Sequence, residues 1–171
     1  MEVERRDFLK AVAAGALIPT DDLLKRATAV ARNVRAADLY DESIVIDTLA
    51  VGLQWDEIEF EAVAKSGYTA IQTTLPSNNF DVAMRALAEW NTRIETHSDT
   101  LIRAHGAADI ERAKAERKMA VILGFQNAIM IEDDVDNLDK LYAEGTRCIQ
   151  LTYNDRNLLV DGCTEIGRAH V

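Results

Sequence analysis

Short apolar, β-branched runs alternate with longer amphipathic segments along most of this chain. The runs have the length and composition of buried strands. They occupy residues 43–47, 68–75, 100–104, 119–125 and 148–153. The intervening segments are long enough for helices, and repeated strand–helix units are typical of parallel strands joined by crossover connections. The pattern therefore predicts an α/β fold.

The clearest helix lies between the second and third runs. Apolar side chains recur there at i, i+3, i+4, i+7 and i+11, which places them on one helical face. They are Ala83, Ala86, Leu87, Trp90 and Ile94. Asn78 or Asn79 can cap the start of this helix. Another helix is predicted to begin after Asp133 and Asp134, whose carboxylates suit the positive end of a helix dipole, and to end at Gly145.

The spacing of the runs favours one α/β architecture over another. Strand starts recur about every 20 to 30 residues, close to the roughly 31 residues per unit of an eight-fold barrel of about 250 residues. The prediction is an incomplete (β/α)8 TIM-type barrel with about five of the eight strands present. The alternative is a doubly wound open sheet, which would usually carry a glycine-rich phosphate loop after a strand. No such loop follows any of the runs.

Composition and net charge limit the classes of molecule that this chain could bind. The residues are 48% apolar and 28% charged, which is typical of a packed globular domain. A net charge of -10 argues against nucleic acid, because binding a phosphate backbone needs clustered Lys and Arg. No run reaches the roughly 18 apolar residues of a transmembrane helix. Cys148 and Cys163 are too few for a disulfide framework or a thiolate zinc site.

The N-terminus resembles an export signal. Arg5 and Arg6 precede Phe-Leu-Lys and an Ala-rich apolar stretch, as in a twin-arginine leader. Residues 1–29 are interpreted as this leader, which would place the protein in the periplasm or outside the cell. Charged residues lie between the apolar stretch and the cleavage-like Ala-Thr-Ala at 27–29. The alternative is therefore an amphipathic first helix, in which case the protein would be cytoplasmic. Residues 30–42 are expected to be a linker or helix.

Polar residues at the strand ends are the first candidates for chemistry, because barrel active sites form at the C-terminal ends of the strands. They are Asp47, Thr74, His105, Gln126, Asn127, Tyr153 and Asn154. Each alone could equally cap a helix or satisfy a turn. His105 is more often a loop histidine than a ligand, and His97 is expected to be solvated at a helix end.

A carboxylate cluster follows Trp55 and Asp56. It consists of Glu57, Glu59 and Glu61. A solvated helix face is the favoured interpretation, and a catalytic carboxylate pair is the alternative.

Several blocks together resemble the membrane (renal) dipeptidase family, peptidase family M19. Residues 151–157, Leu-Thr-Tyr-Asn-Asp-Arg-Asn, followed by Asp-Gly-Cys at 161–163, resemble that family's Leu-Thr-His-Asn segment. Ile46-Asp47 resembles the end of its first strand, residues 120–126 its Gly-Phe/Ile-Glu block, and Gly-Thr-Arg at 145–147 its Gly-Val-Arg turn. The resemblance covers about residues 36 to 165.

The resemblance implies a metal-dependent-hydrolase-like barrel with two zinc ions that activate water to cleave dipeptides. The family's His-x-Asp pair falls on Leu49 and Val51, and its bridging glutamate falls on Gln126. Leu49 and Val51 offer no lone pair to a cation, and Gln126 is a neutral amide that lacks the negative charge of a bridging glutamate. Tyr153 stands where the family has a histidine that polarises the substrate carbonyl, with Asn154 beside it on the substrate side. No intact metal site is therefore expected.

The expected organisation follows from this resemblance. Residues 43–165 form the N-terminal part of a dipeptidase-like barrel, and two further family ligands belong to later strands beyond residue 171. Residues 166–171 match the in-frame translation of a common sequencing-adapter oligonucleotide and are interpreted as an artefactual tail.

The chain is predicted to be a fragment of a hydrolase. Members of the family it resembles use zinc to cleave small peptides. The fragment itself is expected to be inactive and to bind no zinc. A non-catalytic pseudoenzyme or small-ligand binding protein on the same barrel is the alternative. Another barrel hydrolase with ligands around Asp47, His105 or Tyr153 is a third interpretation. A homodimer of the full-length protein is left open.

Overall fold

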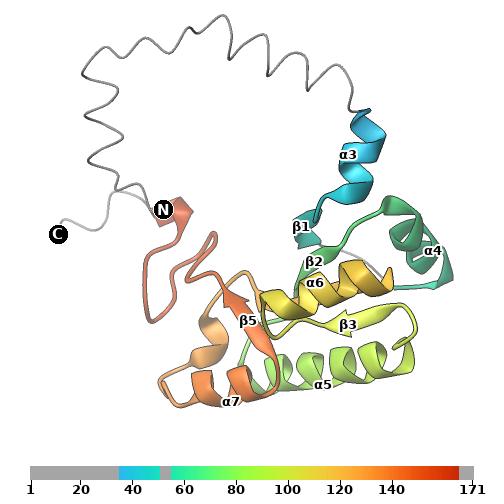
Figure 1. Cartoon of the computed structure of the whole chain (residues 1–171). Helices are drawn as coiled ribbons and strands as arrows, with labels where there is room; N and C mark the ends of the chain where they lie inside the picture. Colours follow the sequence, from blue (N-terminus) through green and yellow to red (C-terminus); the bar gives the residue numbers. More distant parts are fainter. Residues whose placement is uncertain (1–34, 51–54, 166–171) are drawn as a thin grey trace, which may run out of the picture. The chain divides into compact units, whose positions relative to one another are not determined.

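The fold is a parallel sheet with helices between its strands (Figure 1). The structure is a computed structural model that describes residues 35–50 and 55–165. Within these residues five strands form one sheet. They are β1 Ile46–Ala50, β2 Ala70–Thr74, β3 Leu101–Arg103, β4 Met119–Phe125 and β5 Thr146–Ile149. This arrangement confirms the predicted α/β fold class as a partial barrel.

Helices occupy the connections that the sequence predicted. They are α4 Glu57–Ser66, α5 Phe80–Thr96, α6 Ala107–Glu116 and α7 Asn137–Ala143, with 3-10 turns η1 Ile129–Ile131 and η2 Cys163–Glu165. A further helix, α3 Ala36–Glu42, belongs to a separate unit, residues 1–42. The predicted leader lies outside the described residues. No helix in the described ranges is long and apolar enough to cross a membrane.

The strands do not follow sequence order across the sheet. Residues 120–124 of β4 pair directly with β2. On the opposite edge of β4, β3 pairs with residues 119–121 and β5 with residues 123–125. The two edges are distinct because Ala120 donates its N–H toward β2, while the adjacent Met119 donates toward β3. Four strands, β1, β2, β4 and β5, therefore form a continuous arc, and β3 shares one edge of β4 with β5.

This order places helices on both faces of the sheet. The chain crosses the sheet in one direction from β2 to β3 and in the opposite direction from β3 to β4, so right-handed crossovers put α5 and α6 on opposite faces. Side chains of β4 alternate accordingly. Val121, Leu123 and Phe125 belong to the larger core with the buried residues of α5, whereas Ala120 packs in a smaller core with Ala113 of α6.

Helix α5 confirms the prediction made from its periodicity. Its buried residues are Ala83, Ala86, Leu87, Trp90 and Ile94. Asn79 is the N-cap, and its side chain accepts a hydrogen bond from the Val82 N–H at 2.9 Å. Such a cap stabilises a helix by about 1 kcal/mol. The helix ends at His97, which was predicted to be solvated. Instead its ring is partly buried and stacks on Phe60, with ring centroids 4.2 Å apart.

Two strand boundaries differ from the sequence prediction. The first strand lies three residues later than predicted, because its pairing with β2 begins at Ile46 opposite Ala70. The last strand begins at Thr146, two residues earlier than its predicted run, directly after Gly145 turns the chain with a φ of 110°. A φ in this range favours glycine, as the predicted helix end required.

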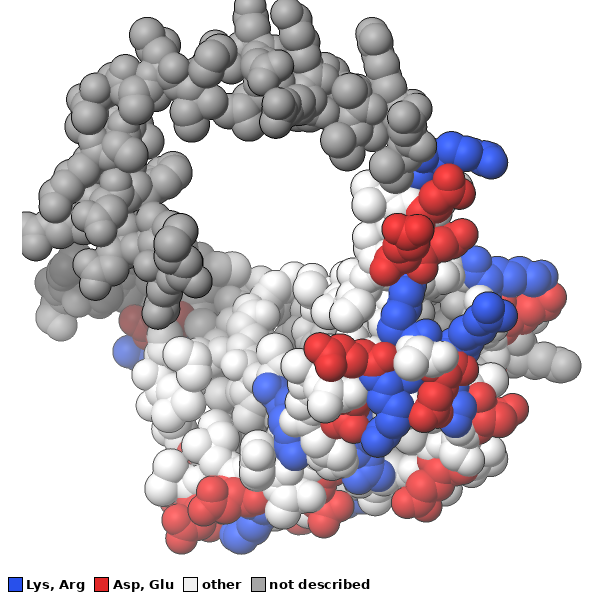
Figure 2. All heavy atoms as spheres, in the orientation of Figure 1, with Lys and Arg blue, Asp and Glu red and all other residues white. Residues whose placement is uncertain are grey.

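The carboxylates after Trp55 form a helix start. Asp56 caps α4 by accepting a hydrogen bond from the Glu59 N–H at 2.9 Å, and the Glu59 carboxylate accepts one from the Trp55 N–H. Glu61 pairs with Lys65 one turn later on the exposed face. These contacts agree with the favoured interpretation of a solvated helix face. On the view in Figure 2, Lys and Arg side chains are interleaved with Asp and Glu.

Candidate functional site at the strand ends

One face of the sheet carries neutral polar side chains where β2, β4 and β5 end. Residues in register on neighbouring parallel strands share a face, and every second residue returns to it. Thr74 is in register with Gly124, and Gly124 with Cys148. We call the set of side chains on this face the strand-end face. It comprises Gln72, Thr74, Gln126, Cys148 and Gln150.

Gly124 creates the space at the centre of the strand-end face. A Cβ atom at this position would lie 2.7 Å from the Cys148 carbonyl oxygen and 2.8 Å from Gln72 Nε2. The Gln72 carboxamide therefore lies over the backbone of β4, and its Nε2 donates a hydrogen bond to the Thr73 carbonyl at 3.1 Å. Sequence reasoning missed Gln72. The signal was a single amide inside the otherwise apolar or hydroxylated run at 68–75.

Gln126 follows β4 directly and is half-buried. Within the residues that the structure describes, its carboxamide makes no hydrogen bond. Gln150 follows β5, and its Nε2 donates to the Thr152 carbonyl at 2.6 Å. The face thus presents amide donors and acceptors without a formal charge.

Asn157 holds the loop after β5 against the end of β4. Its Nδ2 donates to Asn127 Oδ1 at 2.9 Å and to the Leu151 carbonyl at 2.6 Å. Its Oδ1 accepts from the N–H groups of Leu159 and Val160 at 2.8 and 3.1 Å. Asn127, a candidate from sequence, therefore has a structural role here.

Tyr153 and Asn154 lie in the same loop. Tyr153 is 52% exposed, and its backbone carbonyl accepts from the Cys163 N–H at 3.0 Å. Asn154 Oδ1 accepts from Cys163 Sγ at 3.3 Å, and its carbonyl accepts from Thr164 Oγ1 at 2.7 Å. The Asn154 side chain is thus engaged within the loop, whereas the Tyr153 ring stands in solvent.

Asp47 does not lie at a strand end. It is the second residue of β1, in register with Ile71, which is itself in register with Val121. Gln126 follows Val121 by five residues along β4, which corresponds to about 16 Å along the strand direction. The Asp47 carboxylate accepts a hydrogen bond from the Leu49 N–H at 3.0 Å. Asp47 therefore lies within β1 rather than after its last residue.

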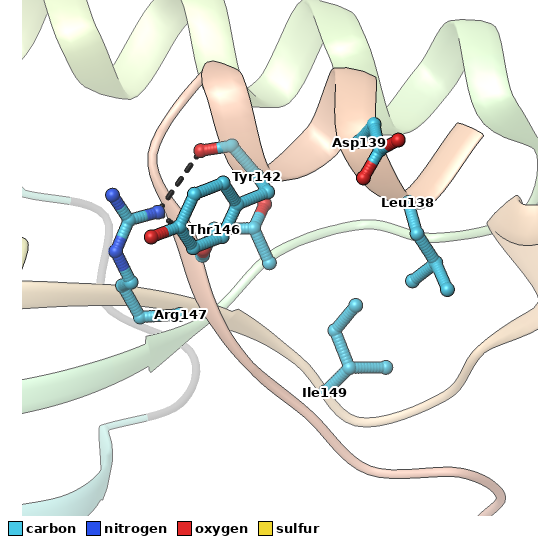
Figure 3. Close-up of a pocket in the computed structure, with 6 residues that line it drawn as sticks. All are labelled: Leu138, Asp139, Tyr142, Thr146, Arg147 and Ile149. Atoms are coloured by element: carbon cyan, nitrogen blue, oxygen red, sulfur yellow. Dashed lines mark hydrogen bonds between the residues drawn. The ribbon is translucent and has the colours of Figure 1, made fainter. Parts of the chain in front are cut away.

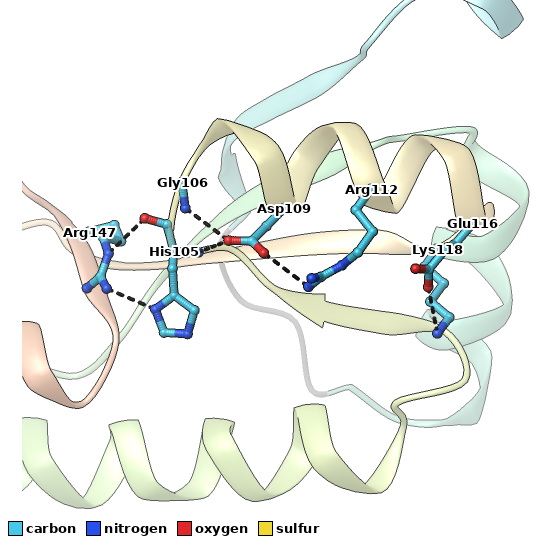
Figure 4. A network of polar contacts seen from close by, with 7 residues as sticks. All are labelled: His105, Gly106, Asp109, Arg112, Glu116, Lys118 and Arg147. Atoms are coloured by element: carbon cyan, nitrogen blue, oxygen red, sulfur yellow. Dashed lines mark hydrogen bonds and ion pairs between the residues drawn. The ribbon is translucent and has the colours of Figure 1, made fainter.

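His105 belongs to a separate polar network around the start of α6 (Figure 4). Its ring Nδ1 lies 2.9 Å from Arg147 Nη2, and its carbonyl accepts from Arg147 Nε at 3.1 Å. Asp109 accepts from the His105 N–H at 2.8 Å and pairs with Arg112 at 3.0 Å. β3 pairs with the first half of β4, so His105 lies nearer the middle of the sheet than Gln126 does.

The network sets the pKa values of two side chains. Desolvation lowers the pKa of His105 below its ordinary value of 6.5, and the neighbouring charges of Arg147 and Arg103 lower it further, against an opposing contribution from Asp109. The backbone N–H of His105 is the main cause that lowers the pKa of Asp109. His105 is therefore biased toward the neutral form, in which Nδ1 can accept a hydrogen bond from the Arg147 guanidinium.

A hollow of about 390 Å³ lies between α7 and β5 (Figure 3). Its lining residues are Leu138, Asp139, Tyr142, Thr146, Arg147 and Ile149. Thr146 and Ile149 are in register with Leu123 and Phe125, so the hollow is on the face opposite the strand-end face. The Arg147 guanidinium closes one side, 4.0 Å from the centre of the Tyr142 ring, and donates to the carbonyls of Tyr142 and Thr146.

Comparison with known proteins decides the family. Residues 35–170 match the membrane dipeptidase family, peptidase family M19. This chain belongs to that family. The assignment confirms the resemblance found in the sequence and makes the chain a member of a hydrolase family. No curated protein sequence matches this M19 chain.

Two solved structures from Pseudomonas aeruginosa share the fold of this M19 chain. An amidohydrolase is 32% identical with a TM-score of 0.71, over 77% of this chain and 41% of its own. The probable dipeptidase PvdM is 16% identical with a TM-score of 0.61, over 73% of this chain and 38% of its own. The M19 chain thus spans less than half the length of either structure.

The side chains of this M19 chain do not fit the two-zinc site that its family implies. Among the described residues, no three His, Cys, Asp or Glu side chains lie close enough together to hold a metal ion. Leu49 is 42% exposed, and its hydrocarbon side chain has no lone pair for a metal ion. Gln126 has a neutral amide. Val51 lies outside the described residues. A divalent cation would meet no carboxylate at these described positions.

Proposed function

We propose that this chain is the front part of a dipeptidase-type hydrolase barrel that does not itself hydrolyse dipeptides. The observation that carries the proposal is Gln126, which follows β4 on the strand-end face where the family resemblance expects a bridging glutamate. Membership of the M19 family supports the hydrolase origin. The changed ligand positions support the loss of metal-dependent turnover.

The physical reason is the charge balance of a two-metal site. Two divalent cations a few ångströms apart repel each other strongly, and a bridging carboxylate offsets this repulsion. The Gln126 carboxamide has no formal charge. Leu49 replaces a second ligand with a side chain that has no lone pair. Water would therefore not be activated as a metal-bound nucleophile on these residues.

A second candidate function is a non-catalytic protein that binds small peptides on the same barrel. Gln72, Gln126 and Gln150 support it, because three strands bring carboxamides to one face. Carboxamides both donate and accept hydrogen bonds, as a peptide group does. This function needs no metal.

Export by the twin-arginine route belongs to the same proposal. It rests on Arg5, Arg6 and the apolar stretch that follows them, all within residues 1–29. A periplasmic or secreted location is the expected consequence. Fusion of residues 1–29 to a reporter that is active only after export would test it, with Arg5→Lys and Arg6→Lys together as the matched control.

Zinc binding and dipeptide turnover of the full chain test the proposed inactivity. Competition with a chromophoric chelator should show no stoichiometric zinc, and a panel of dipeptides should remain uncleaved. The combined variant Leu49→His, Val51→Asp and Gln126→Glu should bind zinc more tightly than the original chain. Gln150→Glu, which makes the same chemical change on β5, is the control and should not. Stoichiometric zinc with chelator-sensitive turnover in the unsubstituted chain would refute the proposal.

A further inference from the structure

β3 and β5 lie one after the other along the same edge of β4. β3 pairs with residues 119–121 of β4, and β5 pairs with residues 123–125. The end of β3 therefore meets the start of β5. Arg147 and His105 make the contact there, with Arg147 Nη2 2.9 Å from Nδ1 of the His105 ring (Figure 4).

Arg103, the last residue of β3, brings a second guanidinium to this junction. Its Cδ is 3.3 Å from the position of a Cβ on Gly145, so its side chain packs on the turn that precedes β5. It is in register with Val121, which places it on the face opposite the strand-end face. Its Nε is buried and has no partner, and its guanidinium makes no hydrogen bond or ion pair with any described residue. The charge of this half-buried side chain thus has no counter-ion among the described residues.

The charge of Arg147 is not neutralised within the network either. Three of its hydrogen bonds go to backbone carbonyls, and the fourth contact is with the His105 ring. Asp109 is the carboxylate of this network, and it is already engaged. It accepts hydrogen bonds from two backbone N–H groups at the start of α6 and pairs with Arg112 at 3.0 Å. The junction therefore carries an excess of positive charge.

Both guanidiniums act on the same imidazole. Besides desolvation, the charges of Arg147 and Arg103 lower the pKa of His105. The whole chain has a net charge of -10, so the positive excess is a local feature of this junction. Two guanidiniums that lack a counter-ion repel each other, and an anion beside both offsets that repulsion.

We propose that Arg103, His105 and Arg147 bind a small oxyanion, a carboxylate or a phosphate group, at the junction of β3 and β5. A planar guanidinium presents parallel N–H donors that match two oxygens of such a group. Arg103 has all of its donors available, and Arg147 has one N–H of Nη2 left beside the His105 ring. The site uses no residue after β5 and none of the strand-end face.

His105 links binding of the anion to pH. In the neutral ring, Nδ1 can accept a hydrogen bond from Arg147. A protonated ring donates from both nitrogens, so Nδ1 then meets another donor and this contact is lost. An oxyanion between the two side chains can accept from both. The charged groups that face the ring are Arg147 from β5, Arg103 from β3 and Asp109 from α6, and the anion offsets the repulsion from the two arginines.

Titration of the full chain with sodium sulfate and, separately, with sodium acetate tests the site at constant ionic strength. Sulfate has the shape of a phosphate group and keeps its charge between pH 5.5 and 7.5. The NMR resonances of the His105 ring and of the Arg147 amide should shift saturably, with a dissociation constant of about 1–10 mM. Binding of sulfate should be at least about threefold tighter at pH 5.5 than at pH 7.5, because the protonated ring adds a positive charge.

The two anions distinguish the sources of the ligand. Tighter binding of sulfate would assign a phosphate group, and tighter binding of acetate would assign a carboxylate. The absence of a saturable shift with either anion at both pH values would overturn the proposal. So would an affinity for sulfate that does not change with pH.

Variants show whether these side chains make the site. Arg103→Gln removes the guanidinium without a counter-ion and should raise the dissociation constant by about tenfold or more. Arg85→Gln makes the same change of charge at an exposed position of α5 and is the matched control. It should change the dissociation constant by less than about twofold. Equal weakening in the two variants would show a general effect of charge and would contradict the proposed site.

Two further variants complete the test, with binding followed on the Arg147 amide. His105→Asn should retain part of the binding and lose its dependence on pH. If Arg103→Gln fails to fold, Arg103→Lys keeps the charge without the planar fork and should weaken binding by about threefold. An unchanged affinity in a folded Arg103 variant would overturn the proposal.

Discussion

The Arg147 side chain holds His105 at two points, with Nε bonded to the His105 carbonyl at 3.1 Å and Nη2 2.9 Å from Nδ1 of its ring. These residues are 42 positions apart in the chain. The same guanidinium bonds to the carbonyls of Tyr142 and Thr146. One side chain therefore ties the segment after β3 to the turn between α7 and β5.

Removal of this guanidinium should destabilise the fold. Arg147→Ala loses four hydrogen bonds, so the free energy of unfolding should fall by about 2 kcal/mol. Urea denaturation measures the change. Arg112→Ala is the control, because it removes only an exposed ion pair with Asp109 and should cost less than about 1 kcal/mol. Equal losses in the two variants would contradict the role assigned to Arg147.

Stability should fall as the pH drops below 6.5, the ordinary pKa of the His105 side chain. The folded state lowers the pKa of this imidazole, so between the unfolded and folded pKa values the unfolded chain binds more protons. The contribution of the neutral imidazole to the free energy of unfolding is therefore fully present above pH 6.5. It is lost as the pH falls toward the lower pKa of the folded state. Denaturation midpoints between pH 7.5 and pH 5 would measure this slope.

His105→Asn should flatten that pH dependence, since an amide does not titrate in this range. Asp109 also has a lowered pKa, and its contribution is lost only when the pH falls below its ordinary value of 3.8. The two side chains therefore change the stability of the protein in different pH ranges. An unchanged slope in the His105→Asn variant would show that another group is responsible.

A side chain at position 124 should disturb the contact between β4 and β5. Gly124→Ala would place a Cβ 2.7 Å from the Cys148 carbonyl oxygen, so the two backbones must move apart. Overpacking of this kind costs about 1–3 kcal/mol. Gly106→Ala is the control for steric crowding, since nothing lies within 4 Å of a Cβ there. Because Gly106 is the N-cap of α6, this substitution should still cost up to about 1 kcal/mol. Thermal or urea unfolding distinguishes the two variants.

Loss of the Asn157 side chain should loosen the loop after β5. Asn157→Ala removes its bonds to Asn127, to the Leu151 carbonyl and to the N–H groups of Leu159 and Val160. The last two amides should then exchange with solvent at least about tenfold faster, while amides within β4 stay protected. The exposed Asn78 offers a control, and Asn78→Ala should leave the loop unchanged. Unaltered exchange at both loop amides would refute the assignment.

The sequence by itself determined the elements and one buried face. The run at 119–125 forms β4 with the predicted bounds. The apolar spacing in α5 correctly predicted its five buried residues. Asn79 was among its two predicted caps. These features are local, because period-2 and period-3.6 patterns and capping bonds involve residues close together in the chain. The family resemblance likewise rested on contiguous blocks, which the match over residues 35–170 confirmed.

Only the tertiary structure decided which elements are neighbours. An apolar run shows that a strand is buried but not which strand pairs with it, so the contact of β2 with β4 and the displacement of β3 could not be predicted. The same holds for Gln72 over Gly124, for Arg147 against His105, and for Asp47 inside β1. Each depends on register between segments far apart in sequence, and register is set by packing of the whole sheet.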